Sequence, residues 1–161
     1  MNSIEVSIAD FHNKQHQQDL IYLLDTYAQD PMGGGNPLSE FSRQNLITQL
    51  QNMPHAISFL CYQGNQAIGL ANCFFGFSTF KCKPLINIHD FVVIETARGQ
   101  NVSKRILQKI EAIGREKGCC KITLEVLDGN IAAQKAYLKY GFENYELDPE
   151  MGKAQFWEKN L

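Results

Sequence analysis

The chain has 161 residues, of which 44% are hydrophobic and 20% are charged, and its formal net charge is −2 at pH 7. This length and balance predict a single domain, 1–161, with a sizeable buried core. The slightly acidic charge argues against a broad nucleic-acid-binding surface, and no apolar run approaches the roughly 20 residues of a membrane span. The N-terminus lacks a basic, apolar leader, so we expect a cytoplasmic protein that binds neither nucleic acid nor membrane.

The cysteines are odd in number and show no CxxC spacing: Cys61, Cys73, Cys82, Cys119 and Cys120. In a protein expected in the cytosol, this pattern indicates reduced and mostly buried thiols. No histidine lies near them in the sequence, so we expect no metal site.

The first elements are a strand and two helices. Residues 4–8 alternate apolar and polar, which is typical of a half-buried strand, and residues 14–28 carry an apolar stripe at helical spacing. A stretch with two prolines and three glycines, residues 30–38, ends this helix, and a second helix is expected from Ser39 to about Pro54. Gly33, Gly34 and Gly35 serve either as a flexible linker or as backbone that a substrate can approach.

Three strands follow, at residues 56–62, 66–77 and 86–94. They are rich in apolar, β-branched and aromatic residues, and turn residues at 63–65 join the first two, so we expect an antiparallel meander. In a regular strand, His89 and Asp90 point to opposite faces, so only one of them would face a given cleft. A β-bulge would change this expectation.

The next segment predicts a turn and then a helix. Val102, Ile106, Ile110 and Ile113 recur at helical spacing, and Gly118 follows the helix. The start of such a helix leaves backbone N–H groups unpaired and carries the positive end of the helix dipole. The turn is therefore either an ordinary connection or an anion site. It contains neither a Walker GxxxxGK[ST] sequence nor a GxGxxG sequence.

The last part of the chain alternates again at residues 121–127, which predicts a strand. Asn130 is a favoured N-cap residue for a helix at 131–140 that Gly141 ends. Residues 142–147 and 153–159 are expected to form a final hairpin in which Trp157 is packed.

Two motifs resemble those of the GNAT family of N-acetyltransferases. The segment from Arg98 to Ser103 is similar to the acetyl-CoA-binding motif Arg/Gln-x-x-Gly-x-Gly/Ala, with Asn101 where Gly is usual and Ser103 where Gly or Ala is usual. Asn tolerates left-handed backbone geometry better than most residues. The segment NIAAQKAYLKYGF, residues 130–142, is similar to the second motif, N-x-x-A-x-x-F/A-Y-x-x-x-G-F. Residues 74–93 resemble the diamine and thialysine acetyltransferases, which carry Glu-Asp where this chain carries His89-Asp90.

This resemblance implies an α+β fold of the acyl-CoA N-acyltransferase type, with a mostly antiparallel sheet of six to seven strands and about four helices. It implies acetyl-CoA as the acetyl donor, a small-molecule primary amine as the acceptor and a homodimer. The substrate-binding residues would be Gly33, Gly34, Gly35, His89 and Asp90. The cofactor-binding residues would be Phe91, Val92, Val93, Arg98, Gly99, Gln100, Asn101, Val102, Ser103, Lys104, Asn130, Ala133 and Tyr137.

Two residues are candidates for the chemistry. Tyr137 aligns with the family's tyrosine that serves the departing thiolate, although a core aromatic would show the same pattern. His89 is a candidate base for the ammonium group of the acceptor, or a hydrogen-bonded strand histidine. The leading hypothesis is therefore acetyl transfer to a polyamine, diamine or lysine-like amino acid. The alternatives are a catalytically silent CoA-binding domain and an enzyme that acts on a peptide or protein amine.

Overall fold

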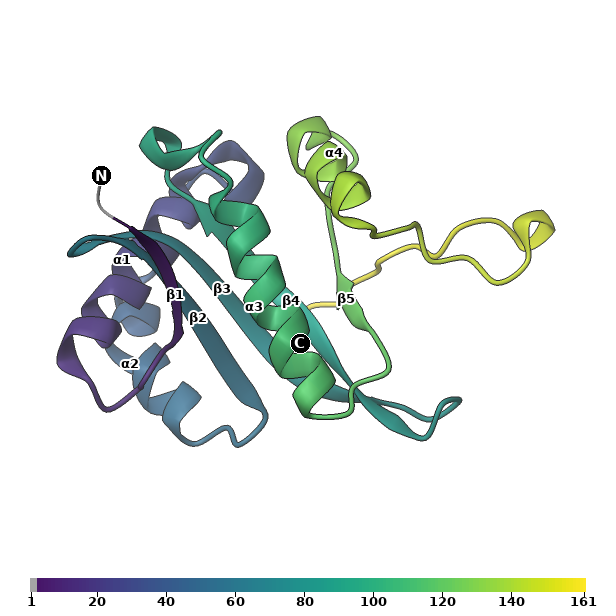
Figure 1. The fold of residues 1–161 in the computed structure, drawn as a ribbon, viewed down its shortest axis with the longest axis horizontal. Coiled ribbons are helices and arrows are strands. Elements are labelled where there is room, and N and C mark those ends of the chain that lie inside the picture. Colours follow the sequence, from purple (N-terminus) through teal and green to yellow (C-terminus); the bar gives the residue numbers. More distant parts are fainter. Residues whose placement is uncertain (1–2) are drawn as a thin grey trace. The chain divides into compact units, whose positions relative to one another are not determined.

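The structure is a computed structural model that describes residues 3–161 (Figure 1). The chain divides into two compact units, 1–124 and 125–161, and each is described by itself. The prediction of a single domain over 1–161 stays a prediction.

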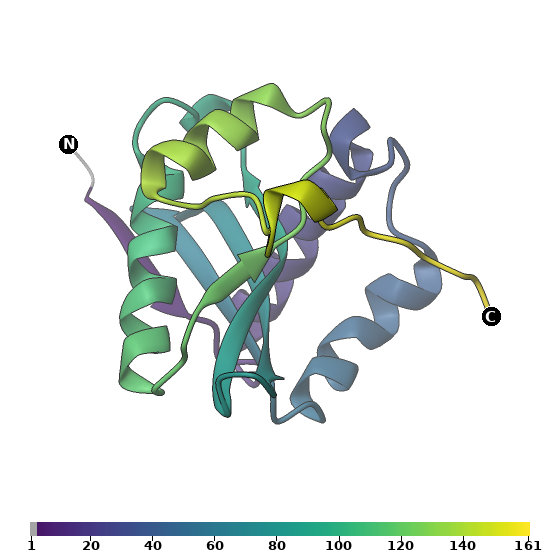
Figure 2. The same ribbon diagram turned by 90° about the vertical axis from the view of Figure 1, so that its right-hand side faces the viewer.

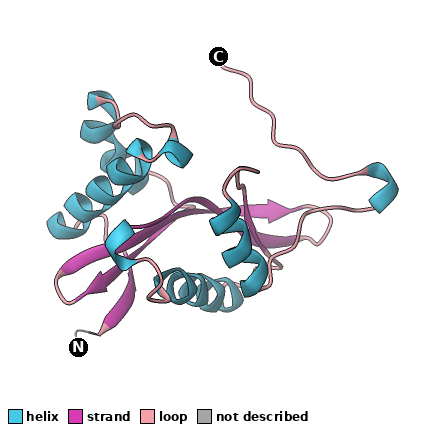
Figure 3. Cartoon of the chain, turned by 90° about the horizontal axis from the view of Figure 1, so that it is seen from above, coloured by secondary structure: helices cyan, strands magenta, loops and turns pink. Residues whose placement is uncertain are grey.

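The first unit is built on a five-stranded sheet in the order β1-β2-β3-β4-β5. The first four strands pair antiparallel, and β5 runs parallel to β4. Helix α1 packs on one side of this sheet and α3 on the other, and α2 lies on the same side as α1 (Figure 3). The elements are β1 (Ile4–Ile8), α1 (Lys14–Gln29), α2 (Glu40–Gln51), β2 (Ala56–Gln63), β3 (Gln66–Ser78), β4 (Lys83–Val93), α3 (Val102–Glu116) and β5 (Ile122–Leu124).

The core lies where the two layers of helices meet the middle of the sheet. Leu20 and Leu23 of α1 are fully buried, as are Ile106 and Ile110 of α3. Gly69 of β3 lets α3 approach closely, because a Cβ atom there would lie 2.9 Å from Cδ1 of Ile106. The helical period that the sequence shows in α3 therefore marks its buried face.

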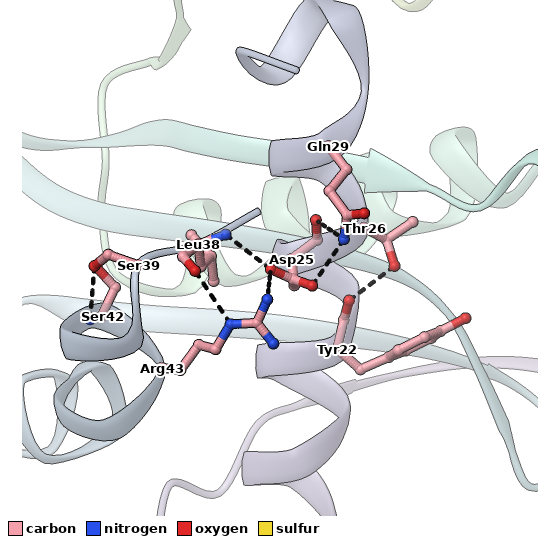
Figure 4. A network of polar contacts seen from close by, with 8 residues as sticks. All are labelled: Tyr22, Asp25, Thr26, Gln29, Leu38, Ser39, Ser42 and Arg43. Carbon is pink, nitrogen blue, oxygen red and sulfur yellow. Dashed lines mark hydrogen bonds and ion pairs between the residues drawn. The ribbon is translucent and has the colours of Figure 1, made fainter. Parts of the chain in front are cut away.

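A polar network joins α1 to the segment that leads into α2 (Figure 4). Oδ1 of Asp25 accepts hydrogen bonds from the backbone N–H of Leu38 at 2.8 Å and from the Arg43 guanidinium at 2.9 Å. The Nε–H of Arg43 also donates to the carbonyl oxygen of Leu38 at 3.1 Å. Since the Asp25 side chain is only 16% exposed, these bonds hold the two helices together in a half-buried setting.

The second unit contains one α-helix, α4 (Ile131–Tyr140). Oδ1 of Asn130 accepts a hydrogen bond from the backbone N–H of Ala133 at 3.2 Å, and Gly141 adopts φ 113° at the other end. Both of these helix ends are those that the sequence predicts.

The predicted hairpin after α4 is wrong. Residues 142–147 and 153–159 form no strand, although a backbone hydrogen bond from Ala154 to Tyr145 links them, and Figure 2 shows a loop with one short helical turn. Trp157 is 82% exposed and Leu147 is 78% exposed. A two-stranded hairpin that buries none of its apolar side chains is not stable by itself. The described residues thus form five strands rather than six to seven, whereas the expected four helices are confirmed.

Two smaller expectations were also tested. Cys61 and Cys73 are buried thiols as expected, but Cys82 is exposed in the turn between β3 and β4, so the cysteines are less buried than predicted. Within residues 3–161, no helix combines the length and apolar character needed to cross a membrane.

Replacing Asp25 tests the network between α1 and α2. We expect Asp25→Ala to lower the stability by about 1.5–3 kcal/mol, because it removes a charged acceptor from partly buried donors. Thermal unfolding should show a decrease of several degrees in Tm. Arg115→Ala is the matched control, since it breaks an exposed pair with Glu111 and should change Tm little. Equal effects of the two variants would contradict this role of Asp25.

Candidate active site

A cavity of about 350 Å³ lies in the first unit between the sheet and the helices α1 and α2. Apolar side chains of the two helices, among them Leu24, Leu46 and Leu50, form one wall. The polar and aromatic groups are Tyr27 of α1 and Asn72, Phe74, His89 and Asp90 of the sheet, and Gly33 of the α1–α2 connection also lines the cavity. An apolar cavity with a few converging polar groups is the usual form of a small-molecule site.

A β-bulge in β4 brings His89 and Asp90 together. On β3, Asn72 pairs with Asp90 and the next residue, Cys73, pairs with Ile88, so His89 is an extra residue on β4. Two neighbouring residues of a bulge can point to the same face, unlike neighbours in a regular strand. Both side chains consequently line the cavity. The expectation that they point to opposite faces is wrong. The cause is the β-bulge in β4, the exception that the sequence analysis allowed.

The imidazole of His89 lies beside an aromatic ring. Its ring centroid is 5.8 Å from that of Phe74, and the planes meet at 73°, an edge-to-face arrangement. Since His89 is otherwise exposed, it can exchange protons with a molecule or a water in the cavity.

The carboxylate of Asp90 acts on the phenol of Tyr27 in this cavity. Burial raises the pKa of the Tyr27 phenol above its ordinary value of 10.0, and the charges of Asp90 and Asp30 raise this pKa further. The carboxylate of Asp90 accepts a hydrogen bond from Nδ2 of Asn72 at 3.0 Å. A cationic group would be favoured in this part of the cavity.

The three glycines of the α1–α2 connection have different roles. A Cβ atom at Gly33 would lie 1.9 Å from the carbonyl oxygen of Tyr27, so the backbone there packs directly against α1. Gly34 and Gly35 adopt φ 114° and 75°, which favours glycine. Only Gly33 of these three lines the cavity, so the structure does not bring Gly34 and Gly35 to it.

The turn before α3 leaves backbone donors at the helix start. Asn101 adopts the left-handed conformation, φ 62° and ψ 19°, and no side chain caps the helix. Arg98 lies beside this turn, where its guanidinium donates to the carbonyl oxygen of Val93 at 3.3 Å and pairs with Asp30 at 3.5 Å. Such a helix start can hold an anionic group such as a phosphate.

Tyr137 lies in the second unit, on α4. Its ring packs edge-to-face on Phe142, with centroids 5.7 Å apart. Tyr137 and Ala133 are both half-buried within α4. The packing of the ring agrees with a structural role, and it leaves a role for the hydroxyl open.

Other features add nothing to this site. A second cavity of about 310 Å³ lies between β1 and α3, and its lining includes Arg105 and Lys109 but no acidic residue or histidine. Among residues 3–161, no group of three or more His, Cys, Asp or Glu side chains could hold a metal ion.

The acetyltransferase (GNAT) family matches this sequence over residues 20–142. The chain belongs to the GNAT family. This match includes both motifs and every residue of the cavity.

Curated relatives in the GNAT family match shorter stretches. The thialysine N-epsilon-acetyltransferase of Bos taurus is 32% identical over 82 residues, which cover 51% of this chain and 48% of that protein. The glucosamine 6-phosphate N-acetyltransferase 1 of Dictyostelium discoideum is 37% identical over 62 residues, 38% of each chain. The chain thus spans about half the length, or less, of the curated relatives it matches. The expected likeness to the thialysine branch is confirmed.

Solved structures confirm the GNAT fold. A probable acetyltransferase superposes with a TM-score of 0.78 at 22% identity, and 99% of each chain is covered. An aminoglycoside N-acetyltransferase in complex with CoA superposes with a TM-score of 0.75 at 18% identity, covering 100% of this chain and 97% of that chain. At these identities the likeness supports the α+β fold alone.

The sequence pointed to His89, Asp90 and Gly33 of this cavity, but not to Tyr27 and Asn72, which also line it. Tyr27 belongs to the apolar stripe that predicts α1, and Asn72 lies in a segment that predicts a strand. Asn72 did leave a signal, because it is a lone amide inside the apolar run of residues 67–75. A buried amide in such a run needs hydrogen-bond partners.

The pKa of Tyr27 provides a test of the charge at the cavity. Asp90→Asn removes a negative charge that raises this pKa, so we expect the phenol to ionise at lower pH in the variant. Ultraviolet difference titration of the phenolate measures this change, and Tyr27→Phe identifies the signal. Asp30→Asn should lower the pKa by less, because its charge has the smaller effect. An unchanged titration in Asp90→Asn would contradict the placement of this carboxylate.

Proposed function

We propose that this chain is an N-acetyltransferase that moves an acetyl group from acetyl-CoA to a primary amine of a small molecule, by direct attack in a ternary complex. The observation that carries the proposal is the pair formed by His89 and Asp90, which both line one cavity because of the bulge in β4. This cavity thus offers a base and a carboxylate to an amine that arrives as an ammonium ion.

The turn before α3 is the proposed place of the acetyl-CoA pyrophosphate. Support comes from the uncapped helix start, the left-handed Asn101 and the match to the family's cofactor motif. The pantetheine arm would pair with the backbone of Phe91, Val92 and Val93. The predicted contacts to the cofactor further include Arg98, Gly99, Gln100, Val102, Ser103, Lys104, Asn130 and Ala133.

The reaction forms a C–N bond and breaks the C–S bond of the thioester. His89 takes a proton from the ammonium group, directly or through a water, and a backbone N–H of β4 stabilises the oxyanion. As the tetrahedral intermediate collapses, its nitrogen loses a second proton and the departing thiolate gains one, so the products are the amide, free CoA and the one proton that His89 returns to solvent. Because a phenol is a weaker acid than a thiol, Tyr137 is proposed to stabilise the thiolate by a hydrogen bond rather than to transfer its proton fully.

The proposed acceptor is a polyamine, a diamine or a lysine-like amino acid. The named activity of the thialysine relatives supports this class, and so does the carboxylate of Asp90 in a cavity of about 350 Å³. A substrate contact at Gly33 fits the same cavity, whereas contacts at Gly34 and Gly35 rest on the family resemblance alone. A homodimer and a cytoplasmic location stay predictions, of which light scattering tests the first.

The decisive experiment is release of free CoA thiol from acetyl-CoA in the presence of a panel of amines. We expect turnover with thialysine, lysine, diamines or spermidine, and little with peptides that carry one free amine. Turnover on the peptide amines alone would favour a peptide acceptor. Binding of acetyl-CoA with no turnover on any amine would favour a silent CoA-binding domain and contradict the proposal.

Tyr137→Phe separates cofactor binding from chemistry. The variant keeps the ring that packs on Phe142, so folding and acetyl-CoA affinity should change little. If the hydroxyl assists the departing thiolate, kcat should fall about 10²- to 10⁴-fold. Tyr140→Phe is the matched control, because the Tyr140 ring also packs near Phe142 but has no proposed role in the reaction. Near-normal turnover of Tyr137→Phe would mean that water or another group serves the thiolate.

A further inference from the structure

Three polar residues stand in a row across the middle of the sheet. Ser58 of β2 pairs directly with Asn72 of β3, which pairs directly with Asp90 of β4. The hydroxyl of Ser58 donates to Oδ1 of Asn72 at 2.7 Å, and Nδ2 of Asn72 donates to Oδ2 of Asp90 at 3.0 Å. Ser58 is 1% exposed and Asn72 is 3% exposed, so the row leads from the core to the cavity.

The direction of these hydrogen bonds is set by their last member. An ionised carboxylate only accepts hydrogen bonds, so the Asn72 side chain must present its NH₂ group to Asp90. Its carbonyl oxygen then faces β2, where only a donor such as the Ser58 hydroxyl satisfies it. The opposite orientation would set two oxygen atoms against each other in a poorly solvated place.

The same amide favours the bulge. If the pairing of Cys73 with Ile88 continued without the extra residue, Asn72 would lie opposite His89, and Asp90 would lie opposite Ala71. Alternation along the strand would then place Asp90 on the α3 side of the sheet, among buried apolar residues. A buried charge and a buried amide would both lose their partner, which is costly.

One oxygen of Asp90 remains for a ligand. Oδ2 is engaged by Asn72, whereas Oδ1 accepts no hydrogen bond from any residue that the structure describes. Asp90 lines the cavity, and the hydrogen bond from Asn72 holds its carboxylate on the side of the sheet core. The other oxygen, Oδ1, can then accept a hydrogen bond from an ammonium group in the cavity.

From this arrangement we infer that Asn72, oriented by Ser58, is a positioning residue for the acceptor amine: it favours the bulged register and holds the Asp90 carboxylate in the cavity. The inference rests on the proposed function for the identity of the ligand. The hydrogen-bonded row itself does not depend on that function.

The first test therefore needs no turnover. In ¹⁵N–¹H spectra of the wild-type protein, the side-chain NH₂ of Asn72, assigned with Asn72→Leu, should be protected from hydrogen exchange. Asp90→Ala and Ser58→Ala should each shift these signals and reduce the protection. Titration with thialysine should shift the same signals in the wild-type protein. The inference would be overturned if the Asn72 side-chain NH₂ exchanges freely and its signals shift in neither variant. This result would hold whether or not the protein has acetyltransferase activity.

The second test uses kinetics with the best amine of the panel. Asn72→Leu should raise KM for the amine about 10- to 100-fold, the usual effect of losing a hydrogen bond to a charged group, with KM for acetyl-CoA within about twofold. Ser58→Ala should raise KM for the amine by a smaller factor, and Ser58→Thr, which keeps the hydroxyl, should restore it. Cys61→Ala is the matched control, because Cys61 is fully buried on β2 but pairs with Gly69, away from Asp90.

The outcomes separate the two proposals. Equal losses in Asn72→Leu and Cys61→Ala, or a loss that affects both substrates alike, would reduce Asn72 to a structural residue and overturn the inference. If Asn72→Leu does not fold, the pair Ser58→Ala and Ser58→Thr decides the question by the same comparison. If the wild-type protein turns over no amine, the proposed function fails, and the spectra together with the thialysine titration still decide whether Asn72 positions Asp90 for an amine.

Discussion

The extra residue in β4 is the constraint on which the candidate site depends. Without it, the two residues proposed to act on the acceptor amine, His89 and Asp90, would lie on opposite faces of the sheet. With it, an imidazole and a carboxylate share one cavity, while the strand beyond the bulge still pairs with β3 as far as Val93. A bulge costs regular pairing, and we infer that the hydrogen bond between Asn72 and Asp90 across the two strands offsets that cost.

The opposite wall of the cavity depends on polar contacts as well. The Asp25 carboxylate holds the start of α2 against α1, and the absence of a side chain at Gly33 lets the connection lie directly on the α1 backbone. Both faces of the cavity are thus set by hydrogen-bonded backbone and half-buried charge rather than by apolar packing alone. Such contacts require defined geometry, which makes them suited to a site that must hold a small molecule in one orientation.

Sequence reasoning worked best where a local pattern has one structural solution. The apolar period of α3 and the Asn130 cap are both local properties, and the structure has each of them. It worked poorly where a strand depends on a partner. The strand predicted at residues 121–127 covers only Ile122–Leu124, the part that pairs with β4. Residues 142–147 and 153–159 have strand-like alternation but no strand that pairs with them.

The sequence by itself determined the GNAT family, the order of most elements and the turn that precedes α3. Motifs and periodicity depend only on residues that are close together in the sequence. It also named His89, Asp90 and Gly33 as candidates for the acceptor site. Only the tertiary structure decided that both members of the His-Asp pair face one cavity, that Tyr27 and Asn72 line it as well, and that Ser58 bonds to Asn72 from the core. The physical reason is that a bulge is a property of pairing between two strands. Its register follows from the hydrogen bonds that buried groups such as Asn72 can make across the sheet, and these partners are distant in the sequence.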